Sequence, residues 1–250
     1  MKIAVLSDLH LKSDQVTLRR KFVKLLDALR EEAKISDLWL LGDIFDLLIG
    51  PFDFWREQYS DIFEGLAKIR KAGIKVLWLE GNHDFHIQEF LDKIGIDVAD
   101  GEITYLGSQA QKIYLAHGDL VNHDDQLYLK WRNITRSKVF RRALDFTPNF
   151  VAKKYLLPFA EKRSASSRAH HIDRQYPRLR EMYRSFAQKK FEGGFSAVFM
   201  GHCHVEDFFI EGKNFYINLG SALDGTLRYA LWDLEKDRFP KCLEYPKIEP

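Results

Sequence analysis

The tetrapeptide Gly81-Asn82-His83-Asp84 follows an apolar run of strand length, Ile74-Lys75-Val76-Leu77-Trp78-Leu79. A strand that ends at a glycine presents the next side chains at the carboxyl edge of a sheet, where α/β proteins place their ligand-binding groups. Asn82 offers a neutral oxygen to a cation, His83 can carry a proton near neutral pH, and a carboxylate such as Asp84 can orient an imidazole. Taken alone, the stretch is equally consistent with a polar turn that contains a histidine by chance.

Four other strand-like runs of the chain end in the same kind of residue. The residues at these ends are Asp8 and His10 after 3–6, Asp43 after 38–41, His117 after 112–116, and His202 and His204 after 196–200. Apolar residues at helical spacing, from Leu18 to Ala33 and from Ile62 to Ala72, separate the first three strands. This β-α-β-α-β order predicts a parallel sheet with right-handed crossovers.

With Asn82, these strand ends supply two Asp, one Asn and four His, a set suited to two divalent cations that share one bridging carboxylate. Mixed imidazole and carboxylate ligands suit manganese, iron, zinc or cobalt better than calcium or magnesium. Two such ions about 3.5–4 Å apart can hold a phosphate oxygen and activate water. Independent polar clusters would require the same coincidence at all five strand ends, so the sequence predicts a dinuclear metal site.

Composition narrows the cellular setting. A chain of 250 residues that is 46% hydrophobic can bury the core of one large domain. Its two cysteines, Cys203 and Cys242, predict no disulfide framework, which favours a reducing cytoplasm. The first strand becomes polar at Ser7, too early for a signal peptide, and no apolar run approaches the roughly 18–20 residues of a membrane span. We therefore expect a cytoplasmic protein, at most peripheral on the cytoplasmic face of the inner membrane.

The net charge of +2 conceals a strongly basic segment. Between Gln126 and Phe191 there are 17 Lys and Arg against 4 Asp and Glu, so this segment carries +13 and the remainder of the chain −11. Aromatic residues are interleaved with the basic ones, a combination typical of helices that lie on anionic lipid. A contact with a nucleic-acid backbone and a plain solvated helical surface are the alternatives.

Five motifs in this order resemble the calcineurin-like metallophosphoesterase superfamily: Asp8-x-His10, Gly42-Asp43-x-x-Asp46, Gly81-Asn82-His83-Asp84, His117-Gly118-Asp119 and Gly201-His202-x-His204. The resemblance covers about residues 1–120 and 195–235. It implies an α/β fold, a four-layered αββα sandwich, with the core at 1–123 and 193–250 and a basic helical lid insertion at 124–192.

The same resemblance implies roles for the site residues. Asp8, His10, Asp43 and His204 would hold one metal, and Asp43, Asn82, His117 and His202 the other, with Mn²⁺ as the metal expected. His83 would assist catalysis at the leaving oxygen, and Asp84 would orient it. Asp46 and Asp119 would fix the orientation of the ligands.

Within the superfamily, the chain further resembles the UDP-2,3-diacylglucosamine hydrolases of lipid A synthesis. The shared features are Ile49-Gly50 after the second motif, Asp124-Asp125 after the fourth, and the helical basic lid. This resemblance implies hydrolysis of a pyrophosphate bond to give 2,3-diacylglucosamine 1-phosphate and UMP. The aromatic residues of the basic segment favour lipid over nucleic acid, so we expect an anionic membrane surface as a partner and no nucleic acid. The substrate-binding residues implied are Asn82, His83, Asp125, Ser167, His171, Arg174 and His202.

One departure keeps a second hypothesis open. Well-known members of that family have an arginine where this chain has His83, which weakens the inference about the substrate more than the inference about hydrolysis. A phosphodiesterase or phosphatase that acts on another nucleotide or on nucleic acid is the alternative. A non-catalytic scaffold on this fold would be expected to have lost metal ligands, and this sequence keeps all seven.

Overall fold

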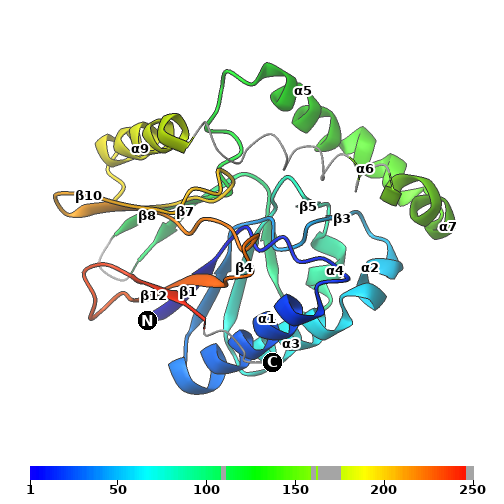
Figure 1. The fold of residues 1–250 in the computed structure, drawn as a ribbon, viewed down its shortest axis with the longest axis horizontal. Helices are drawn as coiled ribbons and strands as arrows, with labels where there is room; N and C mark the ends of the chain where they lie inside the picture. Colours follow the sequence, from blue (N-terminus) through cyan, green and yellow to red (C-terminus); the bar gives the residue numbers. More distant parts are fainter. Residues whose placement is uncertain (108–110, 159–161, 163–175, 246–250) are drawn as a thin grey trace.

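Two β-sheets pack face to face in the computed structural model, and helices cover both outer sides (Figure 1). The structure describes residues 1–107, 111–158, 162 and 176–245. The larger sheet has six strands in the order β13-β12-β1-β2-β4-β6. Their bounds are β1 Lys2–Leu6, β2 Asp37–Leu40, β4 Lys75–Leu79, β6 Asp97–Ala99, β12 Arg228–Asp233 and β13 Lys241–Glu244.

The four strands β1, β2, β4 and β6 are parallel, as the β-α-β-α-β pattern predicts, while β12 runs antiparallel to β1. The second sheet has the order β10-β11-β9-β8-β7 and is mixed, with β11, β9 and β8 parallel to one another. Its strands are β7 Glu102–Leu106, β8 Lys112–Ala116, β9 Ala197–Phe199, β10 Asp207–Glu211 and β11 Asn214–Asn218.

The helices beside the larger sheet include α1 (Val16–Ala28), which continues into a π-helical turn, η1 (Leu29–Ala33), and α3 (Ser60–Lys71). Helix α1 buries Leu18, Phe22 and Leu25, whose spacing places them on one face. Shorter elements complete this side: β3 Leu48–Ile49, α2 Asp53–Gln58, β5 Asp84–Phe85 and α4 Gln88–Asp92. Strands β3 and β5 pair in parallel as a small separate sheet.

Alternation along the strands of the larger sheet divides its side chains between two cores. In β1, Ala4 and Leu6 face α1 and α3, whereas Ile3 and Val5 belong to the core between the two sheets. A third core lies on the outer face of the second sheet, under α9 (Tyr176–Glu192), which buries Tyr183, Ala187 and Phe191 there. The layers are thus helix, sheet, sheet, helix, which confirms the predicted αββα sandwich.

The remaining helices form an extension that we call the arm. It comprises α5 Gln126–Thr135, α6 Lys138–Asp145, α7 Asn149–Val151 and a π-helical turn, η2, Ala152–Leu156. In Figure 1 the arm reaches to the upper right, away from α9 at the upper left. The predicted lid at 124–192 therefore contains two different parts. Helix α9 is packed on the sheet as the fourth layer of the sandwich, and the arm is the part that projects from it.

Candidate metal centre

The loops that follow the strands hold most of the predicted ligands in an uncommon backbone conformation. Positive φ angles occur at Asp8 (51°), His10 (47°), Asp43 (53°), His202 (67°) and His204 (57°). Left-handed backbone costs a non-glycine residue on the order of 1–3 kcal/mol and persists only where the surroundings impose it. Here the loops impose this conformation on one another through backbone hydrogen bonds. The N–H of Asp8 donates to the Gly42 carbonyl (3.1 Å), and the N–H of His10 donates to the Asp43 carbonyl (2.9 Å).

The first predicted ligand set converges in space. Single ligand atoms of Asp8, His10, Asp43 and His204 all lie within 4.8 Å of one another. The Nε2 atoms of His10 and His204 are 2.9 Å apart, and His10 Nε2 is 3.8 Å from Asp43 Oδ2. His204 Nε2 lies 3.5 Å from Asp8 Oδ1. Two imidazole nitrogens and two carboxylates directed at one point are the donor set of a transition-metal site.

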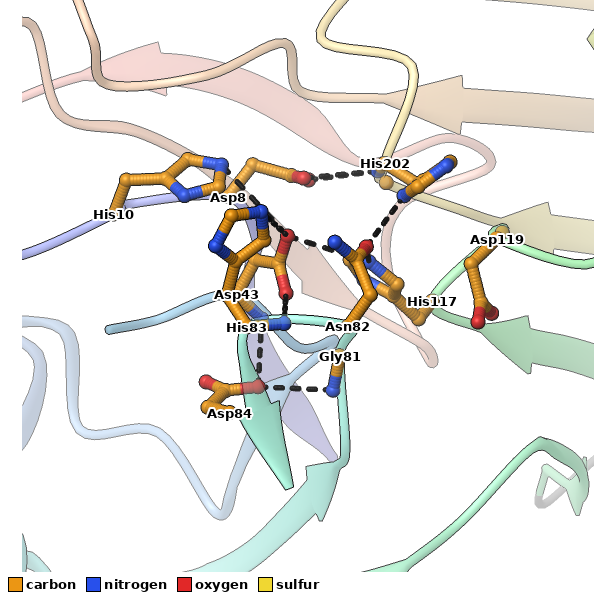
Figure 2. Close-up of polar contacts among 12 residues, drawn as sticks. Asp8, His10, Asp43, Gly81, Asn82, His83, Asp84, His117, Asp119 and His202 are labelled. Carbon is orange, nitrogen blue, oxygen red and sulfur yellow. Dashed lines mark hydrogen bonds and ion pairs between the residues drawn. The ribbon is translucent and has the colours of Figure 1, made fainter. Parts of the chain in front are cut away.

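The second predicted set converges beside the first (Figure 2). Asn82 Oδ1 is 3.0 Å from His117 Nε2 and 2.7 Å from His202 Nδ1. His117 Nδ1 lies 2.8 Å from the Leu41 carbonyl, to which only a protonated nitrogen can donate. This hydrogen bond leaves the lone pair of neutral His117 on Nε2, directed at the cluster.

Asp43 lies between the two sets. Its Oδ2 is 3.8 Å from His10 Nε2 and 3.6 Å from His117 Nε2. Burial raises the pKa of Asp43 to about 8, His117 opposes this, and the neighbouring carboxylates of Asp84 and Asp8 reinforce it. Burial lowers the pKa of His202 to about 3, so its imidazole is a neutral ligand at physiological pH. A buried carboxylate that ionises with difficulty beside the neutral imidazole of His202 fits a site for divalent cations, because their charge would offset the cost of burying the carboxylate charge.

His83 directs one ring nitrogen into this cluster. Its Nδ1 lies 2.8 Å from the Asp46 carbonyl, and its Nε2 faces Asp43 Oδ2 at 4.0 Å. The ring meets His10 edge-on, with centroids 5.0 Å apart and planes at 89°. Because a backbone carbonyl can only accept a hydrogen bond, His83 carries a proton on Nδ1, and any second proton resides on Nε2 toward the cluster.

Asp84 has a different task from the predicted one. Its carboxylate accepts hydrogen bonds from the N–H groups of Gly81 and Asp43, both at 2.9 Å, and of Ile44 at 2.8 Å (Figure 2). The His83 ring is oriented by the Asp46 carbonyl instead. Burial raises the pKa of Asp84 to about 7, although these amide hydrogen bonds oppose the shift. The prediction that Asp84 orients His83 is therefore wrong: Asp84 binds the second motif to the third through their backbones.

The motif glycines are required by close packing between loops. A Cβ added to Gly81 would lie 2.2 Å from Asp43 Oδ1, and one added to Gly201 would lie 2.2 Å from Asp8 Oδ2. At Gly42, whose φ is +86°, the added Cβ would lie 2.7 Å from Gly81 and from His117 Nδ1. Each glycine thus makes room for a predicted ligand or a loop of another motif.

This packing predicts a large effect for Gly42→Ala. The methyl group must displace the loop of Asn82 or that of His117, and misplacement by about 1 Å can cost roughly 100-fold in rate. We expect Gly42→Ala to lose metal content and to lower kcat by about that factor. The matched control is Gly73→Ala, because Gly73 has φ +83° but open space around its Cβ position. It should show only the cost of left-handed backbone, about 1–2 kcal/mol, measured by chemical denaturation. Equal metal content in the two variants would contradict the packing argument.

Three side chains that the sequence analysis did not single out as site residues contact the ligand loops. Tyr128 and Arg132 bind the Asp119 carboxylate, and Arg136 binds Glu80 and the Gly81 carbonyl. Burial would raise the pKa of Asp119, but the neighbouring His117, His202 and Arg132 side chains and the hydrogen bond from Tyr128 hold it well below its usual range. The available signal was the spacing of four residues, which places Tyr128, Arg132 and Arg136 on one face of a predicted helix.

The residues predicted to bind substrate lie in different parts of the molecule. Asn82, His83 and His202 lie in the cluster, as described above. Asp125 is exposed and caps α5, accepting a hydrogen bond of 3.0 Å from the Tyr128 N–H. Ser167, His171 and Arg174 lie outside the described residues. The substrate-binding roles of all these residues stay predictions.

Beside His204 there is a cavity of about 860 Å³. Its lining comes from α9, β10, β12 and β13 and is rich in charged side chains, among them Arg180, Asp207, Arg228 and Glu244.

Among the described residues, every helix is too short or too polar to cross a membrane. Cys203 and Cys242 are both free thiols.

Comparison with known proteins establishes the class of the protein. Residues 1–206 match the calcineurin-like phosphoesterase family, and the chain therefore belongs to this family, as its motifs predicted. A solved structure described as an archaeal phosphodiesterase superposes with a TM-score of 0.52 at 15% identity, covering 98% of this chain and 99% of that one. At this identity the likeness supports the fold alone.

Three curated relatives to which the chain is similar carry the same name. The chain is similar to the UDP-2,3-diacylglucosamine hydrolase of Chromohalobacter salexigens, with 34% identity over 139 residues, 54% of each chain. The enzyme of the same name from Pseudomonas putida is 32% identical over 54% of this chain and 55% of its own. That of Xanthomonas oryzae pv. oryzae is 30% identical over 69% of this chain and 67% of its own. The matched segment thus spans about half the length of the first two relatives.

Proposed function

We propose that the protein is a dinuclear-metal phosphoesterase that hydrolyses the pyrophosphate bond of UDP-2,3-diacylglucosamine. The observation that carries the hydrolytic part is the pair of converging donor sets that share Asp43. Asp8, His10, Asp43 and His204 would hold one cation and Asp43, Asn82, His117 and His202 the other, with Mn²⁺ as the proposed metal and Fe, Zn or Co as alternatives. When bound, such cations supply Lewis-acid chemistry to a phosphoryl group and lower the pKa of water.

In this mechanism the protein's own residues orient the reactants and move a proton. The Nδ1–H of His83 donates a hydrogen bond to the Asp46 carbonyl, so protonated His83 presents its second proton on Nε2, toward the cluster. Delivery of that proton to the leaving oxygen is general acid catalysis. The backbone N–H of His83 donates to Asp43 Oδ1 at 2.8 Å, which ties the position of this acid to the shared carboxylate.

The arm supports the lipid part of the proposal. It displays large apolar side chains to solvent: Leu127 is 81% exposed, Val139 78%, Phe146 86% and Phe150 73%. Exposed apolar patches of this kind mark surfaces that contact a partner, a ligand or a membrane. Basic residues lie among them on the same helices, including Lys138, Arg142 and Lys153. Aromatic and cationic side chains together suit an anionic lipid surface and the acyl chains of a glycolipid.

The charged cavity beside His204 supports the nucleotide part. Its lining elements α9, β10 and β12 lie on the left of Figure 1, whereas the arm lies on the right. A substrate with its diphosphate at the donor sets would find apolar side chains in one direction and hydrogen-bonding side chains in the other. The polarity of the two sides matches the two ends of a nucleotide-linked glycolipid. We propose that the protein acts on this substrate at the cytoplasmic face of the inner membrane, as a peripheral protein.

The alternative function is a phosphodiesterase or phosphatase that acts on another nucleotide or on nucleic acid. The observation in its favour is His83, which can donate a proton to a poor leaving group such as an alkoxide. A basic arm would then contact a nucleic-acid backbone. The exposed apolar side chains of the arm have no evident use in that function.

The two functions predict different substrate dependence. For the glycolipid, kcat/KM of the Mn²⁺-loaded protein should rise steeply with acyl chain length, since each buried CH₂ contributes about 0.8 kcal/mol. The double variant Phe146→Ser/Phe150→Ser should lose at least about tenfold in kcat/KM for the long-chain substrate and nothing for a soluble diester. Leu106→Ser is the matched control, because Leu106 is 68% exposed but lies on β7. Hydrolysis of a dinucleotide or single-stranded DNA as fast as the glycolipid would favour the alternative.

A further inference from the structure

One face of α5 is attached to the loop that follows His117. Arg132 Nε lies 2.6 Å from Asp119 Oδ2, and the Tyr128 hydroxyl donates to the same oxygen at 2.7 Å. Arg132 Nη2 also binds Asp100 Oδ1 at 3.0 Å. Asp119 is two residues beyond His117, so these contacts fix the backbone that carries a predicted metal ligand.

The next turn of the same face is attached to the loop that contains Asn82. Arg136 Nη2 donates to the Gly81 carbonyl at 2.5 Å, and its Nη1 is paired with the Glu80 carboxylate. The side chains of Arg136 and Glu80 are each only 7% exposed. The guanidinium also lies over the Phe85 ring, 4.6 Å from its centroid. Gly81 immediately precedes Asn82, so Arg136 holds the peptide from which that ligand projects.

Stability alone is a poor explanation for this buried pair. Removing two charges from water is costly, and an apolar pair of similar volume often stabilises a protein equally well. An arginine, however, fixes geometry through several directed hydrogen bonds. Arg136 makes such hydrogen bonds to the Glu80 carboxylate and the Gly81 carbonyl, at the start of the Gly81-Asn82-His83-Asp84 motif.

We propose that Arg132 and Arg136 are positioning residues, which make the donor set of Asn82 and His117 depend on the docking of α5. This inference rests on the proposed two-metal function. Because α5 is the first helix of the arm, a shift of the arm would reach this donor set through the two arginines. The cation held by Asn82, His117 and His202 should therefore respond more strongly than the cation held by His10 and His204.

The test uses Co²⁺ as a spectroscopic probe. Wild-type protein and the variants Arg136→Met and Arg132→Met are titrated with Co²⁺ while visible absorption and heat are recorded. In each variant one of the two affinities should fall by about 10- to 100-fold, with a changed absorption spectrum, since residues that support metal ligands typically have this effect. For a soluble diester, kcat should fall by a similar factor and KM should change less. Arg136→Lys should recover part of the loss.

The matched control is Arg70→Met. Arg70 donates to the Ile74 carbonyl at 2.6 Å, just before the start of β4, whereas Arg136 donates to the Gly81 carbonyl just beyond the end of that strand. Its replacement should leave both affinities and the spectrum unchanged. Glu80→Gln in the Arg136→Met background separates stability from positioning. Glutamine removes the unpaired buried charge but keeps an acceptor for the Ile87 N–H, which Glu80 Oε1 binds at 3.0 Å. The double variant should therefore recover the melting temperature but not kcat.

Three results would overturn the inference. They are unchanged affinities and spectrum in Arg136→Met, equal weakening of both cations, and full recovery of kcat in the double variant. If Arg136→Met does not fold, Arg136→Lys and Arg132→Met decide the question by the same readouts. Wild-type protein that binds no cation would overturn the proposed function and this inference with it, whereas two cations in a fully normal Arg136→Met would overturn this inference alone.

Discussion

Asp43→Ala is expected to remove metal and activity together. Oδ2 of Asp43 stands between His10 and His117, at 3.8 and 3.6 Å, so its loss takes one ligand from each donor set. Metal-ion stabilisation of phosphoryl transfer is worth several kcal/mol, and each 1.36 kcal/mol is a factor of ten. We expect kcat to fall by at least about 1,000-fold. The wild type should approach two equivalents of metal by elemental analysis, and the variant should hold less than one.

Folding of the variant can be checked without metal. The pKa of Asp43 is raised to about 8 from the ordinary 3.8, so between these values the folded state binds more protons than the unfolded state. Metal-free wild type should consequently lose stability as pH rises from about 4 to 8, and Asp43→Ala should lose less. An isosteric control, Asp43→Asn, keeps an oxygen for the His83 N–H. One metal equivalent in the wild type, or an active Asp43→Ala, would refute the dinuclear site.

His83→Gln should separate proton transfer from metal binding. His83 contributes its Nε2 to the cluster but belongs to neither of the two ligand sets proposed to share Asp43, so metal content should remain near that of the wild type. Loss of a general acid typically lowers kcat by about 10²–10⁴-fold. That loss should appear with an alkoxide leaving group, which needs a proton.

The comparison substrate is a p-nitrophenyl ester, whose leaving group departs as a stable anion. With this substrate, His83→Gln should retain most of its activity. Equal losses for both kinds of leaving group would assign His83 to substrate orientation. A pH–rate profile adds a second readout, because removal of the acid should abolish the fall in kcat at high pH for the alkoxide substrate only.

The ligand clusters could be predicted because local order in the sequence coincides with spatial order in a parallel sheet. Asp8, Asp43 and Asn82 each follow a strand, and the carboxyl ends of β1, β2 and β4 meet at one edge. The role of Asp84 could not be predicted in this way. Its carboxylate accepts hydrogen bonds from the backbone N–H groups of Asp43 and Ile44, which lie some 40 residues earlier in the sequence. No local sequence pattern indicates that a carboxylate binds such distant backbone.

The boundary between the arm and the sandwich also could not be predicted from the sequence pattern. Helix α9 and the arm share a basic composition, yet Tyr183 and Ala187 are buried on the second sheet whereas Phe146 and Phe150 face solvent. Amphipathic spacing shows that a helix has an apolar face but not what covers it. The small sheet of β3 and β5, with two residues in each strand, is too short to give any periodic signal.

The left-handed backbone at five of the seven predicted ligands has a consequence for the amount of protein in a cell. Each such residue costs on the order of 1–3 kcal/mol, in a domain whose net stability is typically only about 5–15 kcal/mol. Cations that bind only the folded state offset this cost by mass action. A chain that stays unloaded would therefore unfold more often and be degraded sooner. Scarcity of the metal would then reduce abundance first, and the surviving molecules would be those already loaded.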